Sequence, residues 1–300
     1  MTTEHLSCAP GSGINEDLIR VLEGDGLADI LVLDGATSVA DANYVDEVQG
    51  DVAWFTHAFA DALARAIGSG SSQAQAVRCA IGSVRQAYRL AAGERQVPLY
   101  AHPLAALTWI RIRQLDDHLA LSLYCLGDCK AFIVQPDGAA ADLDPYVNPY
   151  EDVLQEAMAA LTLESVTDPI LRRQRLLPML RARRESQHMA PAPNVLCLAP
   201  QGEFDAREYA LEVPLRAAVL AMTDGFYRLV DPYGRYTLED LGRRCRQDGL
   251  APLMRELRQF ELVRTAGDRM AESKAVKSAD DASAVIWTAL APDSSLRDRT

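Results

Sequence analysis

An apolar run that stops abruptly at an acidic residue is the feature that most limits how this chain can fold. Residues 28–35 read Ala-Asp-Ile-Leu-Val-Leu-Asp-Gly, so four consecutive apolar residues lead directly into Asp34 and Gly35. The run predicts a buried strand whose end presents a carboxylate at the rim of the core. Because a glycine follows, the backbone can come close to whatever the carboxylate holds, and a metal ion fits that description.

The same arrangement occurs twice more. The apolar run within 215–222 is followed by Thr-Asp-Gly, which places Asp224 at its end, and Leu-Gly-Asp at 126–128 is a third, varied case with Asp128. A single Asp-Gly pair most often marks a turn, and that interpretation stays open for each one alone. Three acidic strand ends together favour a shared site.

Acidic pairs also precede two predicted strands. An Asp-Gly turn at 25–26 joins the first of these strands to the one ending at Asp34, so Asp17 and Asp34 are expected on neighbouring strands. Oxygen ligands alone suit Mg²⁺ or Mn²⁺, and the absence of histidine from these motifs argues against zinc. The acidic residues at predicted strand starts and ends are Glu16, Asp17, Asp34, Asp128, Asp224, Asp280 and Asp281.

Hydrophobic periodicity predicts helices and strands in alternating groups. Two long helices joined by a Gly/Ser loop form an antiparallel pair that must lay an apolar face on a sheet. A meander of antiparallel strands follows them. The predicted helices are 51–66, 73–93, 237–249 and 252–263, and the predicted strands after the first helix pair are 105–112, 118–126, 130–135, 194–198, 209–213 and 284–290.

The region from about 145 to 190 is predicted to be a helical insertion. It carries a run of six arginines between 172 and 184 within an otherwise acidic protein. Two interpretations remain open for this run: a solvated helix face, or a docking surface for an acidic or phosphorylated partner.

Composition and charge exclude some classes of protein. Forty-two acidic against thirty basic residues give a net charge of -12, which disfavours binding to nucleic acid. No stretch approaches the length of about 18 apolar residues that a membrane span needs, and no secretory signal is visible, so we expect a cytoplasmic protein without a membrane partner. Only two of the six cysteines, Cys125 and Cys129, lie close together, and we expect both to be free thiols.

The order of the acidic motifs resembles that of the metal-dependent protein phosphatases, the type 2C serine/threonine family (PPM), with this chain as a divergent, bacterial-like member. The resemblance implies an α+β fold, a four-layer α-β-β-α sandwich of two antiparallel sheets flanked by helices, formed by residues 1–300 as one domain. The motifs that carry it are Asn15-Glu16-Asp17, Leu33-Asp34-Gly35, Leu126-Gly127-Asp128-Cys129, Met222-Thr223-Asp224-Gly225 and Asp280-Asp281-Ala282-Ser283.

The resemblance also implies roles for these residues in a centre of two Mg²⁺ or Mn²⁺ ions. Asp34 would bridge both ions and the Gly35 carbonyl would ligate one. A water between the ions would attack the phosphorus of phosphoserine or phosphothreonine in a protein substrate, and a kinase is a further candidate partner. The implied catalytic residues are Asp34, Asp224 and Asp280. The implied metal ligands are Glu16, Asp17, Asp34, Gly35, Asp128, Asp224 and Asp280, with Asp128 at a third, looser ion position.

Departures from the family pattern keep other functions open. Ala36-Thr37-Ser38 stands where the family has His or Met before Gly-Gly, and residues 10–14 lack the arginine that grips the substrate phosphate. One alternative is a pseudophosphatase that serves as a binding or regulatory module. Another is a phosphatase of a small phosphorylated metabolite.

Overall fold

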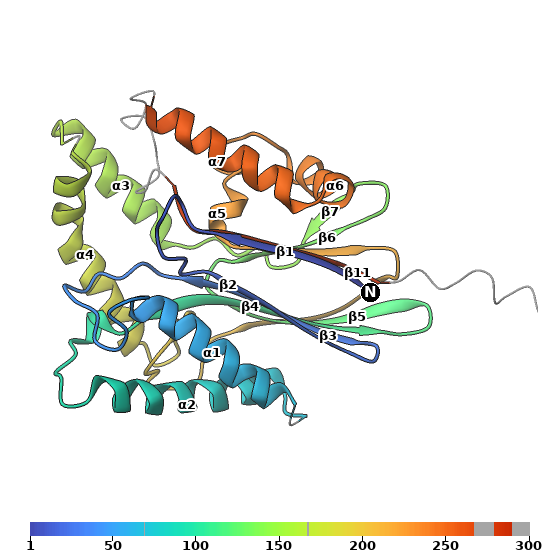
Figure 1. The fold of residues 1–300 in the computed structure, drawn as a ribbon, viewed down its shortest axis with the longest axis horizontal. Helices are drawn as coiled ribbons and strands as arrows, with labels where there is room; N and C mark the ends of the chain where they lie inside the picture. The colour runs from blue at the N-terminus through green and yellow to red at the C-terminus, as the bar shows by residue number, and fades with distance from the viewer. Residues whose placement is uncertain (69, 167, 267–278, 290–300) are drawn as a thin grey trace, which may run out of the picture.

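The computed structural model describes residues 1–68, 70–166, 168–266 and 279–289 as an α+β fold of four layers (Figure 1). Two antiparallel sheets lie face to face, with strand orders β1-β11-β10-β6-β7 and β2-β3-β4-β5-β9, and β8 pairs with β4. The predicted α-β-β-α sandwich is therefore confirmed. The strands are β1 (Thr2–Cys8), β2 (Leu18–Gly24), β3 (Leu27–Gly35), β4 (Leu104–Gln114), β5 (His118–Leu126), β6 (Lys130–Val134), β7 (Ala140–Asp142), β8 (Leu196–Cys197), β9 (Arg207–Pro214), β10 (Ala218–Met222) and β11 (Ala282–Thr288).

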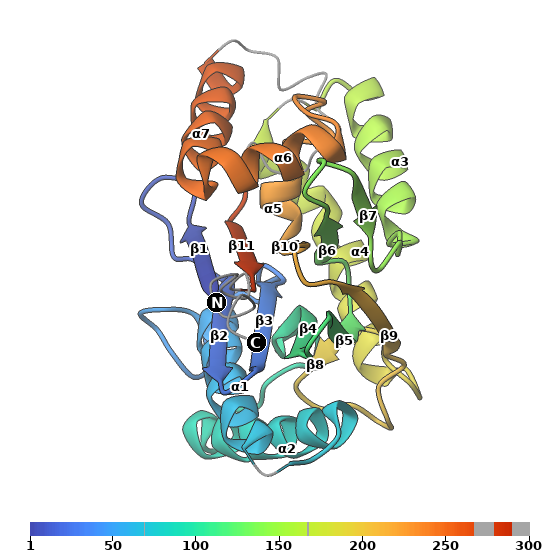
Figure 2. The ribbon, with the colours of Figure 1, turned by 90° about the vertical axis from the view of Figure 1, so that its right-hand side faces the viewer.

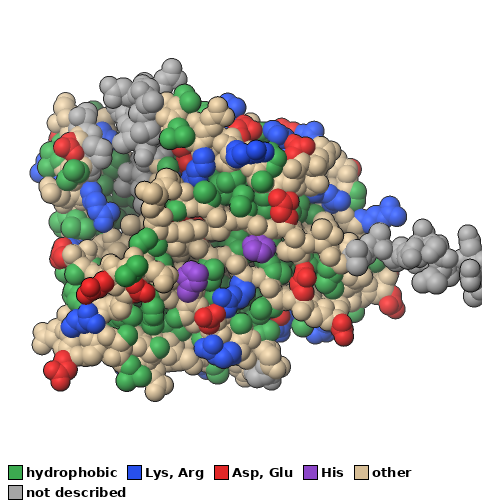
Figure 3. All heavy atoms as spheres, viewed as in Figure 1, with side chains coloured by type: hydrophobic (Ala, Val, Ile, Leu, Met, Phe, Trp, Pro, Cys, Tyr) green, Lys and Arg blue, Asp and Glu red, His purple; other side chains and the backbone are tan. Residues whose placement is uncertain are grey.

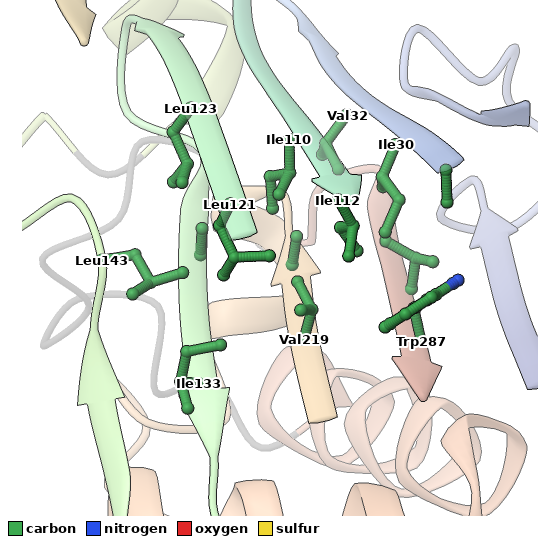
Figure 4. Close-up of a cluster of buried hydrophobic side chains, with 14 of the residues drawn as sticks. Ile30, Val32, Ile110, Ile112, Leu121, Leu123, Ile133, Leu143, Val219 and Trp287 are labelled. Atoms are coloured by element: carbon green, nitrogen blue, oxygen red, sulfur yellow. The ribbon is translucent and has the colours of Figure 1, made fainter. Parts of the chain in front are cut away.

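The core between the sheets follows from the alternation of side chains along each strand. In β3, Ile30 and Val32 point toward the facing sheet, whereas Leu31 and Leu33 point toward the helices. Figure 4 shows Ile30 and Val32 in the layer between the sheets, in one cluster with Trp287 of β11. Because both faces of β3 are buried here, the segment Ile30–Leu33 is continuously apolar rather than alternating.

Helices cover the outer face of each sheet, as Figure 2 shows from the side. The pair α1 (Asp51–Ile67) and α2 (Gln73–Ala92) packs on the sheet that contains β3, as predicted. Ser72 begins α2 with a capping box in which its side chain accepts from the backbone of Gln75. On the opposite sheet lie α5 (Asp224–Tyr227), α6 (Leu238–Asp248) and α7 (Leu250–Ala266).

The predicted helical insertion corresponds to α3 (Tyr150–Leu163) and α4 (Pro169–Met189), which flank one end of the sandwich (Figure 1). The interpretation of the arginine run as a solvated helix face holds only for part of α4. Arg175 is exposed and pairs with Glu164, whereas Arg172 is buried. Other arginines of this helix bind the loop that follows β3, as described below.

Two further observations concern the surface. Acidic and basic side chains are interspersed on the face shown in Figure 3, rather than gathered into one patch of a single sign. Within the described part of the chain, no helix is both long and apolar enough to cross a membrane.

Candidate functional site

The hairpin of β2 and β3 brings the first two acidic motifs together. The register pairs Leu18 with Leu33, so Asp17, directly before β2, lies beside Asp34 near the end of β3. The backbone is tight here, because a Cβ added to Gly35 would lie 2.5 Å from the carbonyl oxygen of Glu16. A residue larger than glycine would therefore force the two acidic segments apart.

The other acidic motifs reach the same end of the sandwich from different elements. Asp128 lies in the tight turn between β5 and β6, and Asp224 begins α5, separated from β10 by Thr223 alone. Asp280 and Asp281 directly precede β11, which pairs with β10. The structure thus gathers all of the acidic residues predicted from the sequence.

The electrostatics of the two central carboxyls confirm that these residues are close together. Burial raises the pKa of Asp34 well above its usual value, and the charges of Asp224, Asp17, Asp128 and Asp280 raise it further. Burial likewise raises the pKa of Asp17 to about 8, with further contributions from Asp224 and Asp281. This crowding of carboxyls is the kind of environment that a bound cation stabilises, since a positive charge favours the ionised forms.

Hydroxyl groups from the opposite sheet hold Asp17. Oδ2 of Asp17 accepts hydrogen bonds from Thr223 Oγ1 at 2.8 Å and from Ser283 Oγ at 3.0 Å. These bonds lower the pKa of Asp17 and so offset part of the effect of burial. Both hydroxyl residues lie within the acidic motifs of the sequence, which predicted no role for them.

Backbone and side-chain contacts connect the remaining acidic residues. The amide of Glu16 donates to Oδ2 of Asp281 at 2.7 Å. Asn148 donates to Oδ2 of Asp128 at 2.8 Å. Arg228 donates to Oδ2 of Asp280 at 3.1 Å. Asn148 and Arg228 had no signal in the sequence, because neither lies in a motif.

The chemistry of the acidic residues fits hard divalent cations, because their carboxylate oxygens are the ligands that such ions prefer. Within the described ranges, however, no three His, Cys, Asp or Glu side chains are arranged as a group that could hold an ion. What favours a cation at this site is therefore the concentration of negative charge rather than a compact set of ligands.

The neighbouring cysteines are not candidates for catalysis. Cys125 and Cys129 are free and buried, as predicted. Burial raises the pKa of the Cys125 thiol to about 12, and it raises the pKa of Cys129 further above its usual value together with the charges of Asp34 and Asp128. These shifts disfavour the thiolate, which is the form in which a cysteine acts as a nucleophile.

No family model matches the sequence, and no curated protein matches it by sequence. Solved structures do match its fold. PppA, described as a key regulatory component of T6SS in Pseudomonas aeruginosa, aligns over 95% of this chain and 96% of its own, with 17% identity and a TM-score of 0.51. A serine/threonine phosphatase of S. agalactiae aligns over 96% of this chain and 100% of its own, with 12% identity and a TM-score of 0.52.

A third similar structure contains the PP2C phosphatase domain and a fragment of the regulatory domain of the cell fate determinant SpoIIE from Bacillus subtilis. It aligns over 95% of this chain but only 62% of its own, with 13% identity and a TM-score of 0.52. The fold is thus that of the type 2C phosphatases, which confirms at the level of fold the resemblance seen in the sequence. At identities this low, function rests on the site itself.

Proposed function

We propose that this protein is a Mg²⁺- or Mn²⁺-dependent phosphatase that hydrolyses phosphoserine or phosphothreonine in a protein substrate. The observation that carries the proposal is the convergence of carboxyls around Asp17 and Asp34, whose pKa values are raised by burial and by one another. A bound cation would stabilise the ionised forms of these carboxyls, which burial and mutual repulsion otherwise disfavour.

The proposed ligands divide between two ions. The residues that would hold them are Glu16, Asp17, Asp34, the Gly35 carbonyl, Asp224 and Asp280. When bound, two divalent cations would lower the pKa of a water between them and neutralise charge on the phosphoryl oxygens. Thr223 and Ser283 keep Asp17 oriented by donating to one of its oxygens, which leaves the other oxygen for an ion.

A melting experiment tests for the ions. Because ligands that bind only the folded state stabilise it by RT ln(1 + [L]/Kd), Mn²⁺ should raise the melting temperature and a chelator should lower it. A melting temperature indifferent to millimolar Mn²⁺ and to chelator would count against any metal centre.

A hydrolysis assay tests for the reaction. We expect Mn²⁺-dependent release of phosphate from an aryl phosphate, and from phosphoserine or phosphothreonine peptides in a panel of sequences. Cleavage of the aryl phosphate without cleavage of any phosphopeptide would favour a small phosphorylated metabolite as substrate. Tight Mn²⁺ binding without any hydrolysis would favour a binding or regulatory module.

A further inference from the structure

A partly buried arginine of α4 holds the loop that follows the Asp34–Gly35 motif. Nη2 of Arg184 donates to the carbonyl oxygens of Ala36 at 2.9 Å and of Thr37 at 2.8 Å. On the preceding side, the amide of Ala36 donates to the carbonyl of Leu104 in β4 at 3.0 Å. The backbone just beyond Gly35 is therefore held at the amide of Ala36 by the sheet. It is held at the carbonyls of Ala36 and Thr37 by Arg184.

Two more arginines of α4 continue this contact along the loop. Nη2 of Arg173 donates to the carbonyl of Ser38 at 2.9 Å, and Nε of Arg181 donates to the carbonyl of Val39 at 2.9 Å. Four successive carbonyls, from residue 36 to residue 39, thus accept hydrogen bonds from three side chains of one helix. Because the contacts involve every residue from 36 to 39, α4 holds this whole stretch of the loop rather than a single point on it.

Arg184 also lies close to the acidic site. Burial lowers the pKa of Arg184 to about 10, neighbouring Arg183 adds to this effect, and attraction to Glu16 opposes it. The side chain thus stays charged at neutral pH. The loop it holds contacts the same carboxylate, because Thr37 Oγ1 donates to Oε2 of Glu16 at 2.9 Å. The guanidinium of Arg184 therefore connects α4, the loop and the first acidic pair.

We propose that Arg184 is a positioning residue for the metal centre, acting by fixing the backbone of Gly35 through the carbonyls of Ala36 and Thr37. This inference rests on the proposed function, in which the Gly35 carbonyl and Asp34 are ligands. Displacing α4 would release the loop and disturb both ligands. The α3–α4 insertion is thereby an element whose position sets the affinity of the centre for ions.

The chemistry of the side chain explains why an arginine occupies this position. Both carbonyls accept from one nitrogen, Nη2, whose two N–H groups lie in the rigid plane of a guanidinium that remains charged in this setting. A lysine would supply one compact charge on a flexible stem, and a glutamine would supply no charge. Arg184→Lys should therefore retain part of the effect and Arg184→Gln little of it.

The test compares these variants with Arg175→Gln, a control on the same helix. Arg175 makes an exposed ion pair with Glu164 and, within the described residues, does not contact the loop, so its removal should change little. We expect Arg184→Gln to weaken Mn²⁺ binding, measured by calorimetry, by about tenfold or more, as removal of a group that orients a ligand does. Amide hydrogen exchange over residues 36–41 in chelator should accelerate in Arg184→Gln and not in Arg175→Gln.

Mn²⁺ affinity in Arg184→Gln indistinguishable from that of Arg175→Gln would overturn the inference while leaving the proposed function intact. A parent protein that binds no Mn²⁺ would instead refute the proposed function. Should Arg184→Gln fail to fold, Arg181→Gln removes the contact to Val39, farther from Gly35. It should then loosen residues 36–41 and weaken Mn²⁺ binding more than the control does, and equality with the control would again refute the role.

Discussion

Asp17 and Thr223 join the two sheets at the acidic end of the sandwich through a hydrogen bond of 2.8 Å between Oδ2 and Oγ1. Asp17 precedes β2 of one sheet, and Thr223 follows β10 of the other. Ser283 in β11 donates to the same oxygen. The carboxyl of Asp17 is thus held by hydroxyls from two strands of the facing sheet while it is buried among other acids.

The first prediction concerns the pH dependence of stability in chelator. The pKa of Asp17 is raised from about 3.8 to about 8, so between these values the folded protein binds more protons than the unfolded chain. The free energy of unfolding should therefore fall as the pH rises from about 4 to about 8. Asp17→Asn keeps an oxygen that accepts from Thr223 and Ser283 but cannot ionise, so it should flatten this dependence.

Urea unfolding of the parent and of Asp17→Asn at several pH values, in chelator, measures this effect. Adding Mn²⁺ to the parent should remove or reverse the fall, because a cation favours the ionised carboxyl. A parent whose stability does not decline across this range would show that Asp17 is ionised without metal.

The second prediction distinguishes a structural aspartate from those of the site. Asp29 is buried in β3 and accepts from Trp109 Nε1 at 2.6 Å and from Arg111 Nε at 2.8 Å. Removing one partner of a buried pair leaves the other uncompensated, so Asp29→Ala should cost roughly 3 kcal/mol of stability. Mn²⁺ affinity of the folded variant should stay at the parent value, as calorimetry can establish. A large loss of Mn²⁺ affinity would mean that the contacts of Asp29 in the middle of β3 affect the acidic site.

The third prediction concerns acid stability at the end of α4. His188 is buried against His102, with Nε2 lying 3.3 Å from the carbonyl oxygen of that residue. Burial lowers the pKa of His188 from 6.5 to about 4, so the unfolded chain binds the proton first as the pH falls. Stability should be lost between about pH 6.5 and pH 4, by roughly 3 kcal/mol for a pKa difference of this size.

His188→Gln has no ionisable group and should lose less stability than the parent over that range. Thermal unfolding at pH 7 and pH 5 compares the two proteins. The same acid-induced loss in both would assign the effect to other groups, among them His102, whose pKa burial also lowers.

The sequence predicted the elements that have strong local signals. The strand that became β3 is buried on both faces, so its run of apolar residues is unbroken, and the turn at 25–26 sets its register with β2. The edge strand β1 (Thr2–Cys8) was not predicted, because it pairs only with β11 and its side chains are partly exposed, which leaves a polar sequence. Edge strands carry little of the pattern that identifies buried ones.

The candidate site was predicted for the acidic residues and not for their partners. Acidic residues at strand ends form a local pattern, whereas Arg184 binds backbone carbonyls of residues that precede it by 147 and 148 positions. Every residue has a backbone carbonyl, so the sequence does not show which carbonyls a side chain will bind. The arginine run could thus be recognised as unusual, but its target could be found only from the fold.

The last prediction treats Asp34, Asp224 and Asp280 as one catalytic unit with two different structural settings. Asp34→Asn and Asp224→Asn each remove one negative charge from a crowded group, so they should abolish Mn²⁺-dependent hydrolysis by weakening ion binding. Melting temperature in chelator should stay level or rise, because repulsion is relieved. Combining the two should cost little further activity, since residues that act as a unit are not additive.

Asp280→Asn should also lose activity, but its stability should change in the opposite direction. Asp280 accepts from Arg228 at 3.1 Å, and Arg228 is buried, so loss of the negative charge leaves that cation with weaker compensation. Melting in chelator should therefore drop for Asp280→Asn alone. Thermal unfolding and hydrolysis assays on the three single variants and the Asp34–Asp224 double variant decide the matter. If Asp34→Asn and Asp224→Asn also melt well below the parent in chelator, these aspartates stabilise turns and helix starts, and the proposed phosphatase loses its main support.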